Sequence, residues 1–184
     1  MITLKQFQRI SEIHANEELT EYYKIISAVA VAKNIPFDEV CKMPYERVRE
    51  LHSKIETKFN NLQNVAYNSI IRAGGIYYQM ETDFSKLSAG QLIELLNYDV
   101  SNDREIVRQM PAILATLSRR CRFYKWRPET YNAQTHSVRA RHFEGVDIQI
   151  ITAYMSFFLV FLQVLLENTR NALAAEMRTI MDKA

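Results

Sequence analysis

The sequence is poor in the residues that interrupt regular structure, with four glycines and four prolines among 184 residues. Because these two residues mark most turns, their scarcity predicts long elements and a mainly helical fold. Cysteine is also rare, since only Cys41 and Cys121 are present and they form no CxxC pair. This pattern argues against a disulfide framework and indicates a reducing compartment.

A marked excess of charge is missing as well. The chain carries 23 basic and 21 acidic residues, which gives a formal net charge of +2. A dedicated nucleic-acid binder usually has a larger positive excess. Hydrophobic residues make up 48% and charged residues 24%, as in an ordinary globular protein. We therefore expect residues 1–184 to form a single domain, with N-terminal helices in 1–62 and a hairpin plus further helices in 63–184.

Apolar residues recur at helical spacing along most of the chain. The helices that this spacing predicts cover residues 3–14, 17–33, 37–43, 44–59, 89–99, 102–118, 135–143 and 146–181. Tyr22 and Tyr23 lie on the apolar face of the second of these helices, and Tyr45 begins that of the fourth. The periodicity therefore predicts that these three rings face the interior.

Local signals mark several helix ends. Thr3 and Ser88 are each followed three residues later by glutamine, which is the pattern of a capping box at a helix N-terminus. Pro36 predicts an end just before it, because the residue that precedes proline avoids helical angles. Pro111 falls inside the helix expected over 102–118, so a kink or a break is expected there.

One segment is predicted to form strands. The sequence SIIRAGGIYYQMETDF is rich in β-branched and aromatic residues and has Gly74 and Gly75 at its centre. Two strands joined by a glycine turn, over about residues 68–81, fit this composition. The glycines lack the spacing of a phosphate-binding loop, so the segment is interpreted as a small β-hairpin.

The predicted last helix contains a long run without charge. Residues 148–166, IQIITAYMSFFLVFLQVLL, could span a membrane by length alone. However, Gln149, Thr152, Ser156 and Gln163 form one polar stripe at helical spacing, which a lipid-facing helix does not need. The stripe favours a core or interface helix over a membrane span. Its rings, which would bind a partner or fill a core, are Tyr154, Phe157, Phe158 and Phe161.

The sequence offers no catalytic, cofactor or metal motif. Its four histidines lack the i, i+4 spacing and the HExxH pattern of metal sites. Neither cysteine stands in an activating glycine-flanked turn, so packed thiols are the simpler interpretation. We expect no enzyme activity, no cofactor and no metal.

The stretch RRCRFYKWR, residues 119–127, combines five cations with three aromatic rings. In a structural interpretation, Arg119 and Arg120 end a helix, where cations favour the dipole, and the rings anchor an extended segment. In a second interpretation, the stretch binds a protein partner, because Trp, Tyr and Arg are enriched in interface hot spots. In a third, it binds nucleic acid, with cations on phosphates and rings on bases. The candidate binding residues are Arg119, Arg120, Arg122, Phe123, Tyr124 and Trp126.

Two segments carry a resemblance to a known family. They are IIRAGGIYYQMETDFSKLSAGQLIELLNY and RARHFEGVDIQIITAYMSFFLVFLQVLLEN, and together they span about residues 69–170. The first segment has a short sheet element followed by a GQ-containing helix, and the second has a late helix with paired phenylalanines. This combination resembles the tail assembly chaperones of tailed bacteriophages.

The resemblance implies a non-enzymatic protein that binds other phage structural or tail proteins. We expect it in the host cytoplasm, without a membrane span. A virion component, such as a tail, ring or adaptor subunit, is similar in composition and stays an alternative, as does self-association into a homo-oligomer. An alternative of a different class is a nucleic-acid-binding accessory protein that uses residues 119–127.

Overall fold

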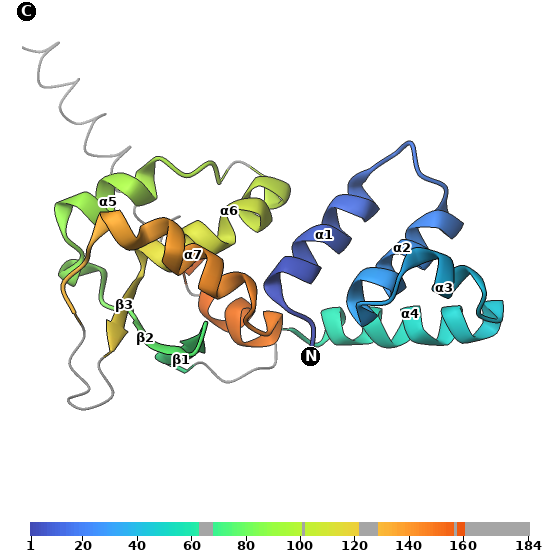
Figure 1. Ribbon diagram of the computed structural model, residues 1–184. Helices are drawn as coiled ribbons and strands as arrows, with labels where there is room; N and C mark the ends of the chain where they lie inside the picture. Colours follow the sequence, from blue (N-terminus) through green and yellow to red (C-terminus); the bar gives the residue numbers. More distant parts are fainter. Residues whose placement is uncertain (63–67, 101, 122–128, 157, 161–184) are drawn as a thin grey trace, which may run out of the picture.

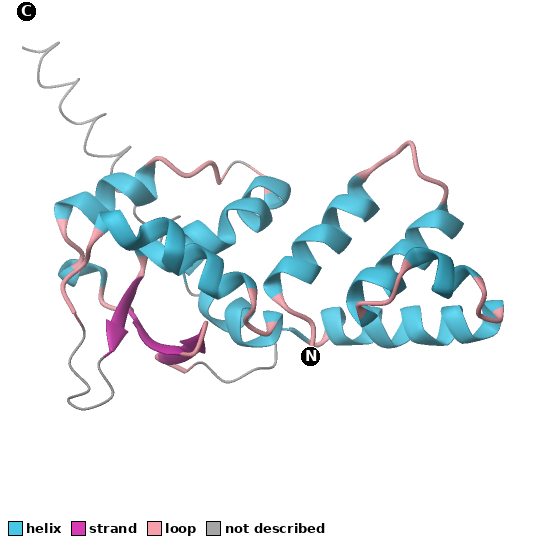
Figure 2. Ribbon diagram, in the orientation of Figure 1, coloured by secondary structure: helices cyan, strands magenta, loops and turns pink. Residues whose placement is uncertain are grey.

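A computed structural model describes residues 1–62, 68–100, 102–121, 129–156 and 158–160 of the chain. The labelled elements are α1 (Leu4–Ala15), α2 (Glu21–Lys33), α3 (Phe37–Cys41), α4 (Tyr45–Asn60), β1 (Ile70–Ala73), β2 (Ile76–Met80), η2 (Phe84–Lys86), α5 (Ala89–Leu96), α6 (Asp103–Thr116), β3 (Ser118–Cys121), η3 (Ala133–Thr135) and α7 (His136–Glu144). A further helix begins at residue 148 and is described to residue 160, with a gap at 157. The fold is mainly helical with a small antiparallel sheet, as predicted (Figure 2).

The helices and the sheet are arranged in two neighbouring groups (Figure 1). Helices α1 to α4 lie together at one end, while the sheet lies at the other end with α5, α6 and α7. Helix α1 borders both groups, because it packs against α2 on one side and against α6 and α7 on the other. One hydrophobic cluster nevertheless continues through both groups, from Val29 in α2 to Ile113 in α6 and Phe143 in α7.

The predicted capping signals are confirmed. The Thr3 side chain accepts a hydrogen bond from the Gln6 backbone N–H, and the Gln6 side chain accepts one from the Thr3 backbone. Ser88 and Gln91 form the same reciprocal pair at the start of α5. Each box satisfies two backbone groups that a helix end leaves without an intrahelical partner. Helix α2 is capped at its C-terminus by Asn34, whose φ of 53° is left-handed and which lies just before Ile35 and Pro36.

The hairpin is present, but the sheet has a third strand that was not predicted. Strands β1 and β2 are antiparallel and join through Gly74 and Gly75, whose φ angles of 55° and 78° suit a two-residue hairpin turn. Strand β3 adds antiparallel to β2, with Tyr78 opposite Arg120. The helix predicted over 102–118 is therefore too long, because α6 ends at Thr116 and the chain turns into β3.

Pro111 lies inside α6, and the helix continues on both sides of it, so a break at this residue is wrong. Proline has no N–H, so the carbonyl of Val107, four residues earlier, loses its usual helical partner. The Gln8 side chain of α1 supplies a donor instead, with Nε2 2.8 Å from the Val107 carbonyl oxygen and 3.0 Å from that of Arg108. A hydrogen bond from a neighbouring helix thus replaces the one that proline removes.

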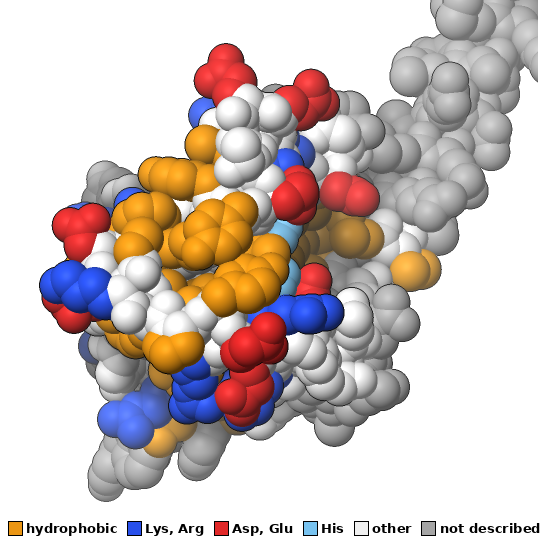
Figure 3. Space-filling view, turned by 90° about the vertical axis from the view of Figure 1, so that its right-hand side faces the viewer, with side chains coloured by type: hydrophobic (Ala, Val, Ile, Leu, Met, Phe, Trp, Pro, Cys, Tyr) orange, Lys and Arg blue, Asp and Glu red, His pale blue; other side chains and the backbone are white. Residues whose placement is uncertain are grey.

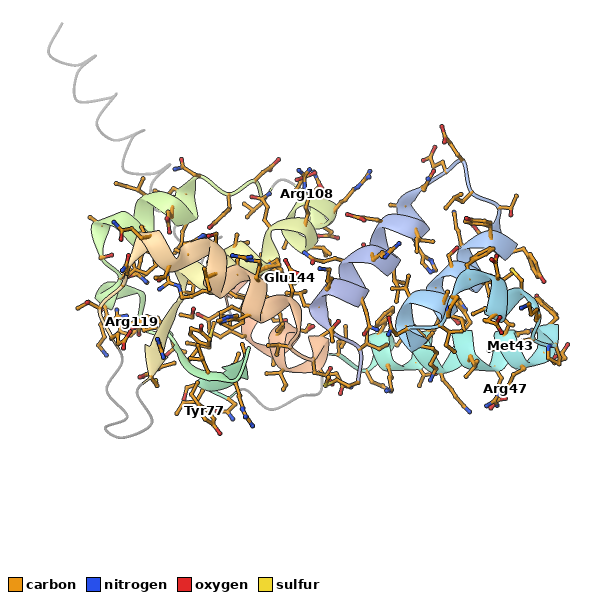
Figure 4. The ribbon with its side chains drawn as sticks, in the orientation of Figure 1. Met43, Arg47, Tyr77, Arg108, Arg119 and Glu144 are labelled. Carbon is orange, nitrogen blue, oxygen red and sulfur yellow. The ribbon has the colours of Figure 1, made fainter. Side chains whose placement is uncertain are left out.

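The start of the chain is joined to the segment before the last helix. The Leu4 N–H donates to the Val146 carbonyl at 2.8 Å, and the Ile148 N–H donates to the Ile2 carbonyl at 2.9 Å. At the next residue of α1, Lys5 Nζ lies 3.1 Å from a carboxylate oxygen of Glu144. Figure 4 shows Glu144 and Arg108 on the side of their helices that borders α1. These contacts fix α1 against the half of the molecule that carries the sheet.

The last helix is embedded in the core as far as it is described. Tyr154 and Phe158 are fully buried, while Ser156 on the predicted polar stripe is exposed. The Tyr154 hydroxyl donates to the Glu81 carbonyl at 2.5 Å, which places this ring beside the segment after β2. The described residues contain no helix that is long and apolar enough to cross a membrane. Phe157, Phe161 and residues 162–166 of the uncharged run lie outside the described residues.

Candidate functional site

The basic-aromatic stretch begins in the sheet and not at a helix end. Arg119 and Arg120 belong to β3, so the interpretation that they stabilise a helix C-terminus is wrong. Arg119 Nη2 lies 3.2 Å from Glu81 Oε2 and 2.8 Å from the Lys86 carbonyl oxygen. Both members of the Arg119–Glu81 ion pair are largely shielded from water. The Arg119 guanidinium is therefore engaged in contacts within the protein. Arg122, Phe123, Tyr124 and Trp126 lie outside the described residues.

A polar network joins α5, α6 and α7 close to this strand. Thr116 Oγ1 is 3.1 Å from His136 Nε2 and 3.0 Å from the Tyr98 hydroxyl, and it donates to Glu94 Oε2 at 3.2 Å. The Tyr131 hydroxyl also donates to Glu94. The pKa of Tyr131 is raised well above the ordinary tyrosine range, mainly by burial and secondly by the hydrogen bond to Glu94.

A hydroxyl beside an imidazole could form a nucleophile and base. Here His136 Nε2 also lies 3.0 Å from the Ala112 carbonyl oxygen, and the Thr116 hydroxyl lies 3.2 Å from the same oxygen. These polar groups therefore have their partners inside the protein and bind the end of α6 to α7. We interpret the network as structural. Among the described residues, no three His, Cys, Asp or Glu side chains come together to form a potential metal site.

The described residues form a distinct surface in the first four helices. Tyr22, Tyr23 and Tyr45 expose 55%, 45% and 47% of their surface, although the periodicity predicted that they face the interior. Tyr22 and Tyr45 have ring centroids 5.6 Å apart, and Tyr23 and Phe37 have theirs 4.9 Å apart. We call these four residues the aromatic surface. Figure 3 shows hydrophobic side chains gathered at this end of the molecule with charged groups around them.

The backbone explains how four rings from three helices meet. Tyr22 and Tyr23 lie in the first turn of α2, while Pro36 and Pro44 directly precede α3 and α4. Both prolines act as N-cap residues with extended angles, so Phe37 and Tyr45 are the first residues of their helices. The rings thus cluster where short connections bring helix ends together. Helical periodicity missed this site because it assigns a residue to a helix face but does not show where a neighbouring helix ends.

A groove runs beside the aromatic surface. It has a volume of about 560 Å³ and is lined by residues of α1, of α2 and of the turn into α3, including Arg9, Ile13, Val31 and Ile35. Tyr23 and Phe37 line it too, so the groove and the aromatic surface are continuous. Arg9 is the one charged residue among the described residues that line the groove, and most of the others are apolar. Glu21 in α2 is paired with Lys24, and Glu39 in α3 is paired with Lys42. Apolar contact is therefore the main attraction that the groove offers.

Comparison of the chain with family models, with curated protein sequences and with solved structures gave no match.

Proposed function

We propose that this chain is a non-enzymatic assembly protein of a tailed bacteriophage, similar to tail assembly chaperones, that binds other structural proteins of the phage. The phage assignment comes from the resemblance of residues 69–170. The observation that supports a binding role is the aromatic surface of Tyr22, Tyr23, Phe37 and Tyr45, together with the groove that continues from it. On this proposal the protein acts in the host cytoplasm.

Exposed tyrosines at one place favour protein binding for a physical reason. A tyrosine buries a large apolar area, keeps one polar group for hydrogen bonding and has few side-chain torsions to immobilise. Such rings are enriched among the residues that dominate binding energy. Singly exposed apolar residues need no explanation, but two pairs of contacting rings beside a groove form a patch, and patches mark interaction sites. The alternative of a virion subunit uses the same surface and differs only in whether the protein stays in the particle.

We predict that replacing both Tyr22 and Tyr45 by serine abolishes binding to the partner and leaves the fold intact. Both rings are about half exposed, so their loss costs little stability but removes the centre of the contact. The measurement is co-purification with structural proteins encoded by the genes that flank its own, each co-expressed singly. The matched control is Ile93→Ser with Leu96→Ser, since these α5 residues are similarly exposed at 61% and 48%. Unchanged binding by the tyrosine variant, or equal loss in the control, would contradict the proposed surface.

The nucleic-acid alternative makes a different prediction. If residues 119–127 bind phosphates, the logarithm of affinity falls with the logarithm of salt concentration with a slope of up to about −4 to −5, because each neutralised phosphate releases counterions. We expect no such binding, since Arg119 is engaged with Glu81 inside the protein. A fluorescence titration with single-stranded and duplex oligonucleotides at two salt concentrations measures this. Micromolar, strongly salt-dependent affinity would favour the accessory-protein function instead.

A further inference from the structure

A second hollow lies on the sheet side of the molecule, far along the chain from the aromatic surface. Its volume is about 160 Å³, and it lies between β2, β3, the segment before η3, and α7. Three basic residues, Arg120, Arg139 and His142, contribute to its lining. Most of the side chains that line it are polar, in contrast to the groove beside the aromatic surface. We call this hollow the basic pocket.

Arg139 is the unusual residue of the basic pocket. It is only 6% exposed, yet its Nε and Nη2 atoms have no hydrogen-bond partner among the described residues. Its guanidinium carbon lies 4.7 Å from the centre of the Tyr131 ring, but a ring offers no acceptor oxygen. A buried cation with unsatisfied donors is costly, so the arrangement favours any ligand that brings acceptors.

The two unsatisfied atoms define the shape of that ligand. Nε and Nη2 form one edge of the planar guanidinium, and their N–H bonds are parallel. Both atoms are covered by protein in this structure, so a ligand in the hollow reaches them only after the Arg139 side chain turns toward it. An oxyanion with two oxygens side by side then accepts both bonds at once, which is the bidentate pairing of arginine with carboxylates and phosphates.

The other groups around the basic pocket favour an anion with several oxygens. Arg120 adds a second guanidinium, and Thr130, Thr135 and Asn132 add neutral donors. The Tyr78 hydroxyl lies 2.8 Å from His142 Nδ1, so when tyrosine donates to this atom, the neutral imidazole keeps its proton on Nε2 and is a donor as well. Glu129 is the one acid among the described residues that line the pocket, and the two arginines outnumber it.

We propose that the basic pocket binds a phosphate group, either as inorganic phosphate or carried on a small monoester. A phosphate has enough acceptor oxygens to take the Arg139 edge and to accept from the surrounding donors, whereas a carboxylate has two oxygens. Ile76 and Val138 in the wall would then contact the group that carries the phosphate. The site lies apart from the aromatic surface and does not depend on the proposed assembly function.

The experiment measures binding of inorganic phosphate, O-phosphoserine and acetate to the whole chain by isothermal titration calorimetry, with thermal unfolding alongside. We expect phosphate or phosphoserine to bind and to raise the unfolding temperature, because a ligand of the native state stabilises it. Arg139→Met should weaken this binding about tenfold or more, because it removes a bidentate charge-assisted contact. The matched control is Arg141→Met, since Arg141 lies on the same helix but is exposed.

Each outcome of these measurements either supports or overturns phosphate binding in the basic pocket. Tighter binding of phosphoserine than of phosphate shows that the wall of the pocket contacts the carrying group, and the reverse shows a site for the free ion. Absence of phosphate and phosphoserine binding up to millimolar concentration overturns the proposal, and so does acetate binding of equal strength or equal weakening by Arg141→Met. If Arg139→Met does not fold, Arg139→Lys and Arg120→Met replace it, and unchanged phosphate binding in both would overturn the proposal too.

Discussion

Replacing Phe158 by alanine is expected to lower the free energy of unfolding by about 3–5 kcal/mol. The Phe158 side chain is completely buried and belongs to the continuous hydrophobic cluster. Its removal loses the transfer free energy of a ring and leaves a cavity that close-packed neighbours can fill only in part. Chemical denaturation followed by circular dichroism, with gel filtration to record the association state, measures the effect.

Val160 provides the control for this substitution. It is two residues further along the same helix but is 65% exposed, so Val160→Ala should change stability by no more than about 0.5 kcal/mol. A loss below about 1 kcal/mol for Phe158→Ala, with an unchanged association state, would show that the last helix does not pack in the core. Similar losses for the two variants would contradict the placement of the helix as well.

A second large effect is expected at the hairpin turn, where Gly74→Ala should destabilise the protein by about 2–5 kcal/mol. The φ angle of Gly74 is +55°, which strains any residue with a Cβ atom. In addition, a Cβ atom at this position would lie 2.5 Å from both Cγ and Cδ2 of His142 in α7, too close for any normal contact. Thermal and urea unfolding of the variant give the magnitude.

Substitution of the neighbouring Gly75 distinguishes the cost of backbone strain from the cost of the clash with His142. Gly75 has a φ of +78° and nothing within 4 Å of its ideal Cβ position, so Gly75→Ala should cost only the backbone strain, about 1–2 kcal/mol. When His142 is also replaced by alanine, the additional cost of Gly74→Ala should fall toward that of Gly75→Ala, and it should stay somewhat higher because the Cβ atom that alanine keeps lies 3.0 Å from the added one. Equal costs for the two single substitutions would mean that α7 does not rest against the turn.

The sequence predicted well those features that depend on neighbouring residues. The capping boxes at Thr3 and Ser88 and the glycine turn at Gly74 and Gly75 were all predicted, because their signals lie within a few residues of one another. Strand β3 was missed for the opposite reason. Its four residues, SRRC, carry no strand pattern, and they pair with β2, which lies about forty residues earlier in the chain.

The same difference between local and long-range signals explains what the sequence showed of the candidate sites. No local pattern distinguishes the exposed tyrosines from buried ones, because their exposure depends on where three helices begin. Arg139 gives no signal in the sequence either, since its burial depends on packing between α7 and residues from β2 onward. The composition of residues 119–127 indicates a candidate binding site, but composition cannot show that Arg119 is paired with Glu81.

The proline in α6 limits how this protein can be divided. A fragment that begins at residue 63 would retain Pro111 but lack Gln8, so the Val107 carbonyl would lose the donor that α1 supplies from 99 residues earlier. The same cut would remove Ile2 and Leu4, whose backbone bonds hold the segment before the last helix. The second half of the chain therefore depends on its first fifteen residues for its internal hydrogen bonding, so excision of that half leaves an incomplete unit.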